Sequence, residues 1–282
     1  MKLYRYFWLI LFFFATPLSA ESLLWQINKD SLKPSYIFGT MHSEDQRVLD
    51  LIPVISERFK QADNVAFEVL MDMPTMTKSA NAMFILGDQT LDKLVDKTVF
   101  VQLVKALKPY KIPANMVKYF KPWAVMIILN MPPSKTGKFL DLQLYKQAQE
   151  LKLPTHGLET VDEQLAVFEV MSIKDQVFLL KESLKQLQQL PELLEKMLKL
   201  YLQGDLNALL NFSNSDGIIK GLYKRLIDDR NLKMLKRMEK LLQKGNAFIA
   251  IGALHLPGEK GVLQLLKQRA YVVKAIPVAM NH

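Results

Sequence analysis

The chain has 282 residues, of which 50% are hydrophobic and 23% are charged, a composition typical of globular proteins rather than of disordered or fibrous ones. It contains no cysteine, which excludes disulfides, thiolate metal sites and a lipoprotein anchor. The formal net charge is +9, but the lysines are spread along helical stretches between leucines and glutamates. That spacing indicates solvent-exposed helix faces, so we expect no nucleic-acid partner.

Residues 1–20 have the pattern of a secretory signal peptide. Lys2 and Arg5 precede an apolar run from Phe7 to Ala15, and Ala20 ends the segment just before polar residues. The run is shorter than the roughly 20 apolar residues that span a bilayer. We therefore expect cleavage, a periplasmic or secreted mature chain over residues 21–282, and no stable membrane insertion after cleavage.

The first third of the mature chain predicts strands around one helix. Two short apolar runs, 23–27 and 35–38, flank a polar turn and predict a hairpin. Apolar residues at helical spacing follow over 48–59. Residues 64–69 are short and apolar, as in a buried strand.

Residues 70–130 are expected to be mainly helical, with Thr90 as the N-cap of a helix that begins at Leu91. The methionines of this stretch, Met71, Met73, Met76 and Met83, are interpreted as flexible core filler, the alternative being an adaptable cover for a substrate.

A helix over 141–151 and a short strand within 153–159 come next. Residues 161–244 are again expected to be mainly helical, with breaks at Pro191, Gly204 and Gly217. A strongly apolar strand over 247–252, a helix near 262–266 and a last strand over 271–276 end the chain.

Both ends of the chain thus repeat one unit, which is an apolar strand, a Gly-x-x-His turn, an amphipathic helix and another strand. The copies run from about Tyr36 to Val69 and from about Phe248 to Ile276. Such a unit requires a crossover between parallel strands. The sequence predicts a single α/β domain whose central mixed sheet is built from the two units, with a large helical insertion.

The two turns, Gly39–His42 and Gly252–His255, follow the carboxyl ends of strands, where α/β sheets form their sites. Glycine allows a close backbone approach there. One such turn is a weak signal, but the chain has only four histidines and two occupy equivalent positions. These two histidines are therefore the first candidates for catalysis.

Glu68 and Glu159 also follow short strands, and a charge beside an apolar strand needs a partner. If these glutamates converge with His42 and His255, the four side chains suit a divalent metal with open positions. They suit metal-free acid–base catalysis equally well. Arg230 is a candidate for holding a carboxylate or stabilising negative charge.

The chain resembles the TraB/PrgY/GumN family, which includes the TIKI proteases and is distantly similar to erythromycin esterase-like and ChaN-like proteins. The resemblance covers residues 24–278 in order. It is carried by Tyr36–His42, Phe67-Glu68, Lys121–Trp123, Leu140-Asp141, Gly157–Thr160 with Gln164, Gly204-Asp205, Arg230-Asn231, Ile251–Gly258 and Gly261–Leu263.

The resemblance implies a hydrolase that depends on a divalent metal, Mn²⁺ or Co²⁺, and cleaves peptide bonds. Its metal ligands would be His42, Glu68, Glu159 and His255, with Arg230 as a further catalytic residue. The expected partner is a peptide or another small envelope substrate. Two alternatives remain open, a metal-free esterase-like hydrolase and a non-catalytic envelope protein that binds a peptide, a glycan or haem.

Overall fold

A computed structural model describes residues 21–214 and 222–278, so the signal-peptide segment and Gly217 lie outside the described residues. Within the described chain, one six-stranded mixed sheet has the strand order β4-β3-β5-β2-β1-β6. The strands are β1 (Leu24–Asn28), β2 (Ser35–Thr40), β3 (Asn64–Phe67), β4 (Thr155–Gly157), β5 (Ala247–Gly252) and β6 (Val272–Ile276). The predicted mixed sheet is confirmed.

Four neighbouring strands, β4, β3, β5 and β2, run parallel. Strand β1 is antiparallel to both β2 and β6. The predicted hairpin is therefore present, with Leu24 opposite Phe38 and Ile27 opposite Ser35. The central strand β5 is almost entirely buried, as expected for a parallel strand that is covered on both faces.

The two repeated units each link strands of the same direction, as predicted, but these strands are not neighbours. Between β2 and β3 lies β5, and between β5 and β6 lie β2 and β1. The two units therefore interlock in one sheet, and the strands that carry the two Gly-x-x-His turns lie side by side.

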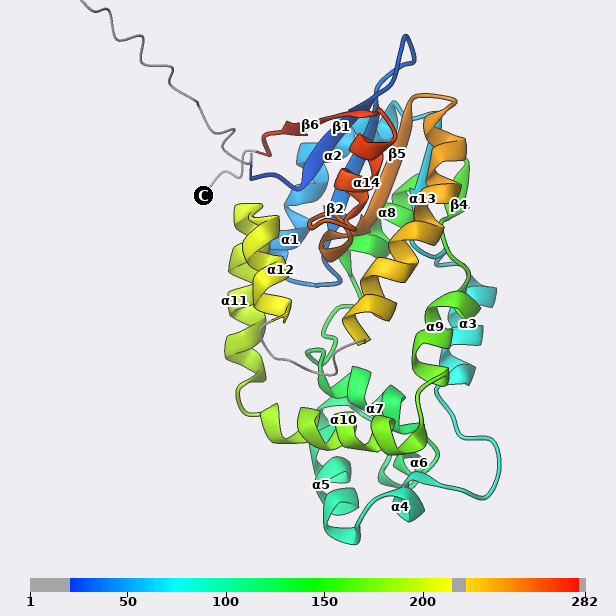
Figure 1. The fold of residues 1–282 in the computed structure, drawn as a ribbon. Coiled ribbons are helices and arrows are strands. Elements are labelled where there is room, and N and C mark those ends of the chain that lie inside the picture. The colour runs from blue at the N-terminus through cyan, green and yellow to red at the C-terminus, as the bar shows by residue number, and fades with distance from the viewer. Residues whose placement is uncertain (1–20, 215–221, 279–282) are drawn as a thin grey trace, which may run out of the picture.

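Helices cover both faces of the sheet (Figure 1). Helices α2 and α8 contact each other on one face, and α13 and α14 contact each other on the other. In chain order the helices are α1 (Gln46–Leu49), α2 (Leu51–Lys60), α3 (Met73–Ala82), α4 (Leu91–Leu94), α5 (Lys97–Leu107), η1 (Lys108–Tyr110), α6 (Ala114–Val117), α7 (Pro122–Leu129), α8 (Leu140–Glu150), α9 (Val161–Glu169), α10 (Ile173–Gln186), α11 (Leu190–Gln203), α12 (Leu206–Asn214), η2 (Lys224–Asp228), α13 (Asp229–Leu242), η3 (Ala253–His255) and α14 (Val262–Gln268).

The helical insertion has a hydrophobic core of its own. Helices α4 to α7 and α10 pack around buried residues that include Leu103, Trp123 and Leu180, at the end of the molecule away from the sheet (Figure 1). A separate core surrounds the sheet. The connections between these two cores run past the carboxyl ends of the strands, because Glu68 and Glu159 both lead from the sheet into helical segments.

Two predicted helix breaks are present. Gly204 ends α11 in the left-handed conformation, with a φ of 73°, as expected for a C-cap glycine. The helical run is also interrupted near Pro191, because α10 ends at Gln186 and α11 begins at Leu190, with this proline in its first turn. A proline at that position is compatible with the helix, since the first turn leaves its backbone N–H groups without helical partners.

Among the described residues, we find no helix of the length and apolarity needed to cross a membrane.

The centre of the sheet gives a direct test of the fold. The Phe248 side chain on β5 is fully buried, and its ring meets that of Phe59 edge-on at 5.1 Å between centroids. We expect Phe248→Ala to lower the free energy of unfolding by about 3–5 kcal/mol, because it leaves a cavity in the core. Val272→Ala on β6, where the side chain is 64% exposed, should change it by less than about 0.5 kcal/mol in the same urea titration.

Candidate active site

The two Gly-x-x-His turns pack against each other at the carboxyl ends of β2 and β5. Thr40 lies opposite Gly252 in the parallel register. A Cβ atom on Gly39 would lie 2.9 Å from Leu256 Cδ1 and 3.2 Å from Ala253 Cα, and a Cβ on Gly252 would lie 2.8 Å from Glu68 Oε1. Both glycines are therefore required by close approach, as predicted for these turns.

A buried tyrosine from the helical part holds the first turn. The Tyr201 hydroxyl donates a hydrogen bond of 2.9 Å to the carbonyl of Gly39. Burial raises the pKa of Tyr201 well above its usual value, so the hydroxyl keeps its proton and remains a donor. Helix α11 is thereby tied to the end of β2.

Glu68 lies one residue beyond β3, and both of its oxygens have partners. Its Oε1 accepts a hydrogen bond of 2.6 Å from the backbone N–H of Gly252, and its Oε2 accepts one of 2.8 Å from Arg230. Burial raises the pKa of this carboxyl, but His255 in its protonated form, the charge of Arg230 and the Gly252 N–H outweigh burial and lower the pKa overall. Glu68 is thus held as an anion.

Arg230 joins Glu68 to Glu159. Its Nε and Nη2 atoms lie 2.8 and 2.7 Å from Glu159 Oε2, while Nη2 also reaches Glu68. The Arg230 side chain is only 10% exposed and that of Glu159 is fully buried. Burial raises the pKa of Glu159, and the attraction of Arg230 does not fully offset it. A third bond, from Nη1 to the carbonyl of Leu226, anchors the guanidinium to the wide turn η2.

The hydrogen bonds of Asn231 determine the tautomer of His255. Asn231 donates from its amide nitrogen to the carbonyl of Lys260, so its amide oxygen faces His255 Nδ1 at 2.6 Å. His255 Nδ1 must then carry the hydrogen. Because burial lowers the pKa of His255 to about 4, the ring is neutral near pH 7 and its Nε2 lone pair points toward Glu68 Oε1, 3.6 Å away.

His42 lies in a different environment. Its side chain is 51% exposed, and its ring stacks on Phe139 with 4.1 Å between centroids and 6° between planes. Its Nδ1 lies 3.4 Å from Asp141 Oδ2, an oxygen that is buried without any hydrogen bond to the described residues. This is a histidine oriented by a carboxylate and open to solvent.

One pocket of about 680 Å³ is lined by His42, Asp141 and Glu68, whereas Glu159, Arg230 and His255 lie outside its lining. Its polar lining includes His42, Glu68, Asp141 and Gln164, and most of the rest of its surface is apolar. Pockets of this size and kind, with a few converging polar groups, are typical of small-molecule and catalytic sites. Its apolar and small lining residues are Phe67, Val69, Leu70, Met71, Met76, Gly137, Phe139, Leu142, Ala250 and Gly252.

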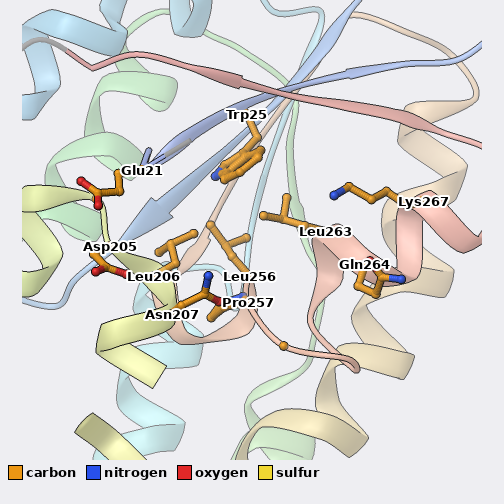
Figure 2. Close-up of a pocket in the computed structure, with 12 residues that line it drawn as sticks. Glu21, Trp25, Asp205, Leu206, Asn207, Leu256, Pro257, Leu263, Gln264 and Lys267 are labelled. Atoms are coloured by element: carbon orange, nitrogen blue, oxygen red, sulfur yellow. The ribbon is translucent and has the colours of Figure 1, made fainter. Parts of the chain in front are cut away.

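A second hollow, of about 220 Å³, lies behind the His255 turn (Figure 2). Its apolar part is formed by Trp25, Leu206, Leu256 and Leu263, with Lys267 at the rim. None of the five predicted site residues lines it. The larger pocket is therefore the candidate active site.

The predicted residues fall into two groups. Glu68, Glu159, His255 and Arg230 form one cluster, whereas His42 pairs with Asp141. Within residues 21–214 and 222–278, no three His, Asp or Glu side chains are close enough together to hold a metal ion. The four predicted ligands include the right donor types for Mn²⁺ or Co²⁺, but as arranged they do not fit a single ion.

Other residues at the site gave weaker signals in the sequence. Asn231 was visible only through the family resemblance, as the neighbour of Arg230. Phe139 and Tyr201 contribute a stacking ring and a backbone tie, and an isolated aromatic residue in a helical stretch gives no sign of either role.

The sequence is similar to known proteins over nearly its whole length. Residues 23–275 match the TraB/PrgY/gumN family. The chain belongs to this family. The metalloprotease TIKI1 of Xenopus tropicalis is 27% identical over 93% of this chain, the metalloprotease TIKI2 of Danio rerio is 27% identical over 91%, and the human metalloprotease TIKI1 is 26% identical over 91%.

The chain spans 63%, 61% and 62% of the lengths of these three relatives, respectively. No solved structure matches it significantly.

The Arg230 cluster predicts a strong stability effect. Arg230→Met should lower the free energy of unfolding by about 3–5 kcal/mol, because the buried Glu159 and the partly exposed Glu68 are left without their cation. Arg237→Met on the same helix removes a half-exposed pair with Glu163 and should cost less than about 1 kcal/mol. Adding Glu159→Gln to Arg230→Met should recover part of the loss in urea denaturation; no recovery would contradict charge repulsion as its cause.

His255 predicts a pH dependence. Between its usual pKa of 6.5 and its folded value of about 4, the unfolded chain binds a proton at this ring and the folded chain does not. Stability should therefore fall as the pH drops through this window, by up to about 3 kcal/mol from this group. Urea titrations at pH 7.5 and 4.5 should show a smaller loss for His255→Gln than for the natural chain; equal losses would contradict a buried neutral His255.

Proposed function

We propose that this chain is a hydrolase that cleaves peptide bonds in the pocket between His42 and Glu68. The observation that carries the proposal is the placement of His42, Asp141 and Glu68 around one largely apolar pocket at the carboxyl ends of parallel strands. The names of the relatives, which are metalloproteases, support the choice of peptide bonds among hydrolysable groups.

His42 has the geometry of a general base. Its Nδ1 lies 3.4 Å from Asp141 Oδ2, so in the reacting complex Nδ1–H would donate to this carboxylate and leave Nε2 to accept a proton from a water molecule. The stacking on Phe139 fixes the plane of the ring. The water oxygen would attack the substrate carbonyl carbon, and His42 would then return the proton to the leaving amine.

Glu68 also lines the pocket, and His255 contacts Glu68 from outside the lining. Glu68 Oε1 and His255 Nε2 are both acceptors, 3.6 Å apart, so they favour a donor between or beside them. Arg230 and the Gly252 N–H hold Glu68 in place, and Asn231 holds His255. In this role Glu68 orients a water or a substrate N–H, and His255 and Arg230 are positioning residues.

Dependence on a divalent metal, Mn²⁺ or Co²⁺, is the part of the proposal that rests on the names of the relatives and on the donor types. If such an ion binds, it would polarise the substrate carbonyl. The metal-free hydrolase is the competing form of the same proposal, and the two differ in their response to chelation.

We also propose that the mature protein acts in the periplasm, on the basis of the signal-peptide pattern in residues 1–20. Mass spectrometry of the protein recovered from a periplasmic fraction should give a chain that begins at Glu21. Recovery of the full-length chain from the cytoplasm would contradict export.

The catalytic proposal predicts that His42→Ala and Asp141→Asn lower kcat by about 10²-fold or more on a peptide that the natural chain cleaves, with little change in melting temperature. His156→Ala is the matched control, because His156 lies near Asn64 at the amino end of the sheet and does not line the pocket. Cleavage is measured by mass spectrometry on a peptide library, with and without added Mn²⁺.

Chelation then distinguishes the metal-dependent hydrolase from the metal-free hydrolase. Loss of cleavage in EDTA and its recovery with Mn²⁺ or Co²⁺ would support the metalloprotease, whereas unchanged cleavage after EDTA would support metal-free catalysis. Full activity of the folded His42→Ala variant would contradict the proposed site in either form.

A further inference from the structure

Helix α3 (Met73–Ala82) is unusual because none of its side chains is buried. Two of its large apolar residues are open to solvent, Met73 at 73% and Met76 at 47% exposure. The interpretation as core filler is therefore wrong for Met73 and Met76, whereas Met83 packs against the helical core. A helix with no buried side chain gains little stability from packing. Its exposed apolar surface is therefore the feature that indicates a function.

One face of α3 forms part of the pocket. Thr75, Met76 and Ser79 line it, together with the apolar residues Phe67, Leu70 and Leu142. Met76 thus contributes an apolar side chain to the pocket and is still half exposed, so it is available to cover whatever enters. Methionine suits this use, since its unbranched side chain adapts to different shapes.

The attachments of α3 are few and lie near the protein surface. Asp72 caps its first turn through the N–H of Thr75 at 2.8 Å. The helix contacts α9, where Lys78 forms an exposed ion pair with Asp162 at 2.5 Å (Figure 1). Exposed ion pairs stabilise little. Helix α3 can therefore shift against the pocket without breaking a core.

The charges of the pocket restrict its occupant. Its described lining includes the acids Glu68 and Asp141 and no lysine or arginine. An acidic group would be repelled and would find no cation, while a large apolar group would remove the surfaces of Met76, Phe67 and Leu142 from water.

From these observations we infer that the pocket selects peptides with a bulky apolar side chain next to the scissile bond, and that Met76 on α3 closes over that side chain. The inference rests on the proposed hydrolase function. It adds the substrate class and names a specificity-determining residue, since Met76 has no part in the proposed chemistry.

The kinetic test uses a cleaved peptide in two versions, with phenylalanine or serine at the residue beside the scissile bond. The natural chain should prefer the phenylalanine peptide by about tenfold or more in kcat/KM. Met76→Asp should lower kcat/KM for that peptide by about tenfold, mainly through KM, and leave the serine peptide within twofold. Met76→Leu should retain the preference, and Met73→Asp on the same helix is the matched control.

Two kinetic outcomes would overturn the inference. One is equal cleavage of the two peptides by the natural chain, and the other is a Met76→Asp effect of the same size on both peptides. The melting temperature of each variant should equal that of the natural chain, because the substitutions lie on a solvent-exposed helix.

A binding measurement keeps the inference testable if no peptide is cleaved. N-acetyl-phenylalanine amide and N-acetyl-serine amide are titrated into the natural chain labelled at its methionine methyl groups. A shift of the Met76 methyl signal with the phenylalanine probe alone would support the apolar pocket while the hydrolase proposal fails. No shift with either probe would overturn the inference, and would do so even for a chain that cleaves peptides.

Discussion

The site depends on one buried cation between two carboxylates. Arg230 reaches from α13 to Glu159 and Glu68, which lie just beyond the carboxyl ends of β4 and β3. The fully buried Glu159 would be unfavourable without a partner, and the guanidinium stabilises it together with Glu68, which is 23% exposed at the pocket. The same contact joins the second half of the chain to the first, because α13 and Glu68 are separated by more than 150 residues of sequence.

Close packing at Gly39 and Gly252 brings the two Gly-x-x-His turns and Glu68 together. Gly39 brings the first turn against Ala253 and Leu256 of the second, and Gly252 lets Glu68 approach the backbone. Because Glu68 then accepts the Gly252 N–H, a carboxylate from β3 is fixed by the end of β5. Residues from both chain ends meet there because β2 and β5 are neighbours in the sheet, in which each unit encloses a strand of the other.

Periodicity and short apolar runs predicted the hairpin, the mixed sheet and the placement of the Gly-x-x-His turns, because these features follow from local pattern and glycine chemistry. The pairing of Arg230 with both glutamates was beyond such reasoning. It depends on how α13 packs on the sheet, and no local pattern carries that information. The break near Pro191 was predictable because proline is unfavourable inside a helix and favourable in its first turn. The prediction that the α3 methionines are buried was wrong because residue type alone cannot show which side of a helix is covered.

His42 and His255 occupy equivalent positions in the repeated unit but have different surroundings. Both follow a glycine at adjacent strand ends, yet His255 is 4% exposed and His42 is 51% exposed. The second turn continues into η3 and is covered by α13, whose Asn231 fixes the ring as a neutral tautomer. The first turn leads into a loop beside Phe139 and Asp141, where the ring stays open to solvent. A buried, neutral ring is suited to holding a neighbour in place, and an exposed ring beside a carboxylate is suited to exchanging a proton with water. In the proposed mechanism, the segments that pack against each turn, rather than the turns themselves, therefore separate a positioning histidine from one that transfers protons.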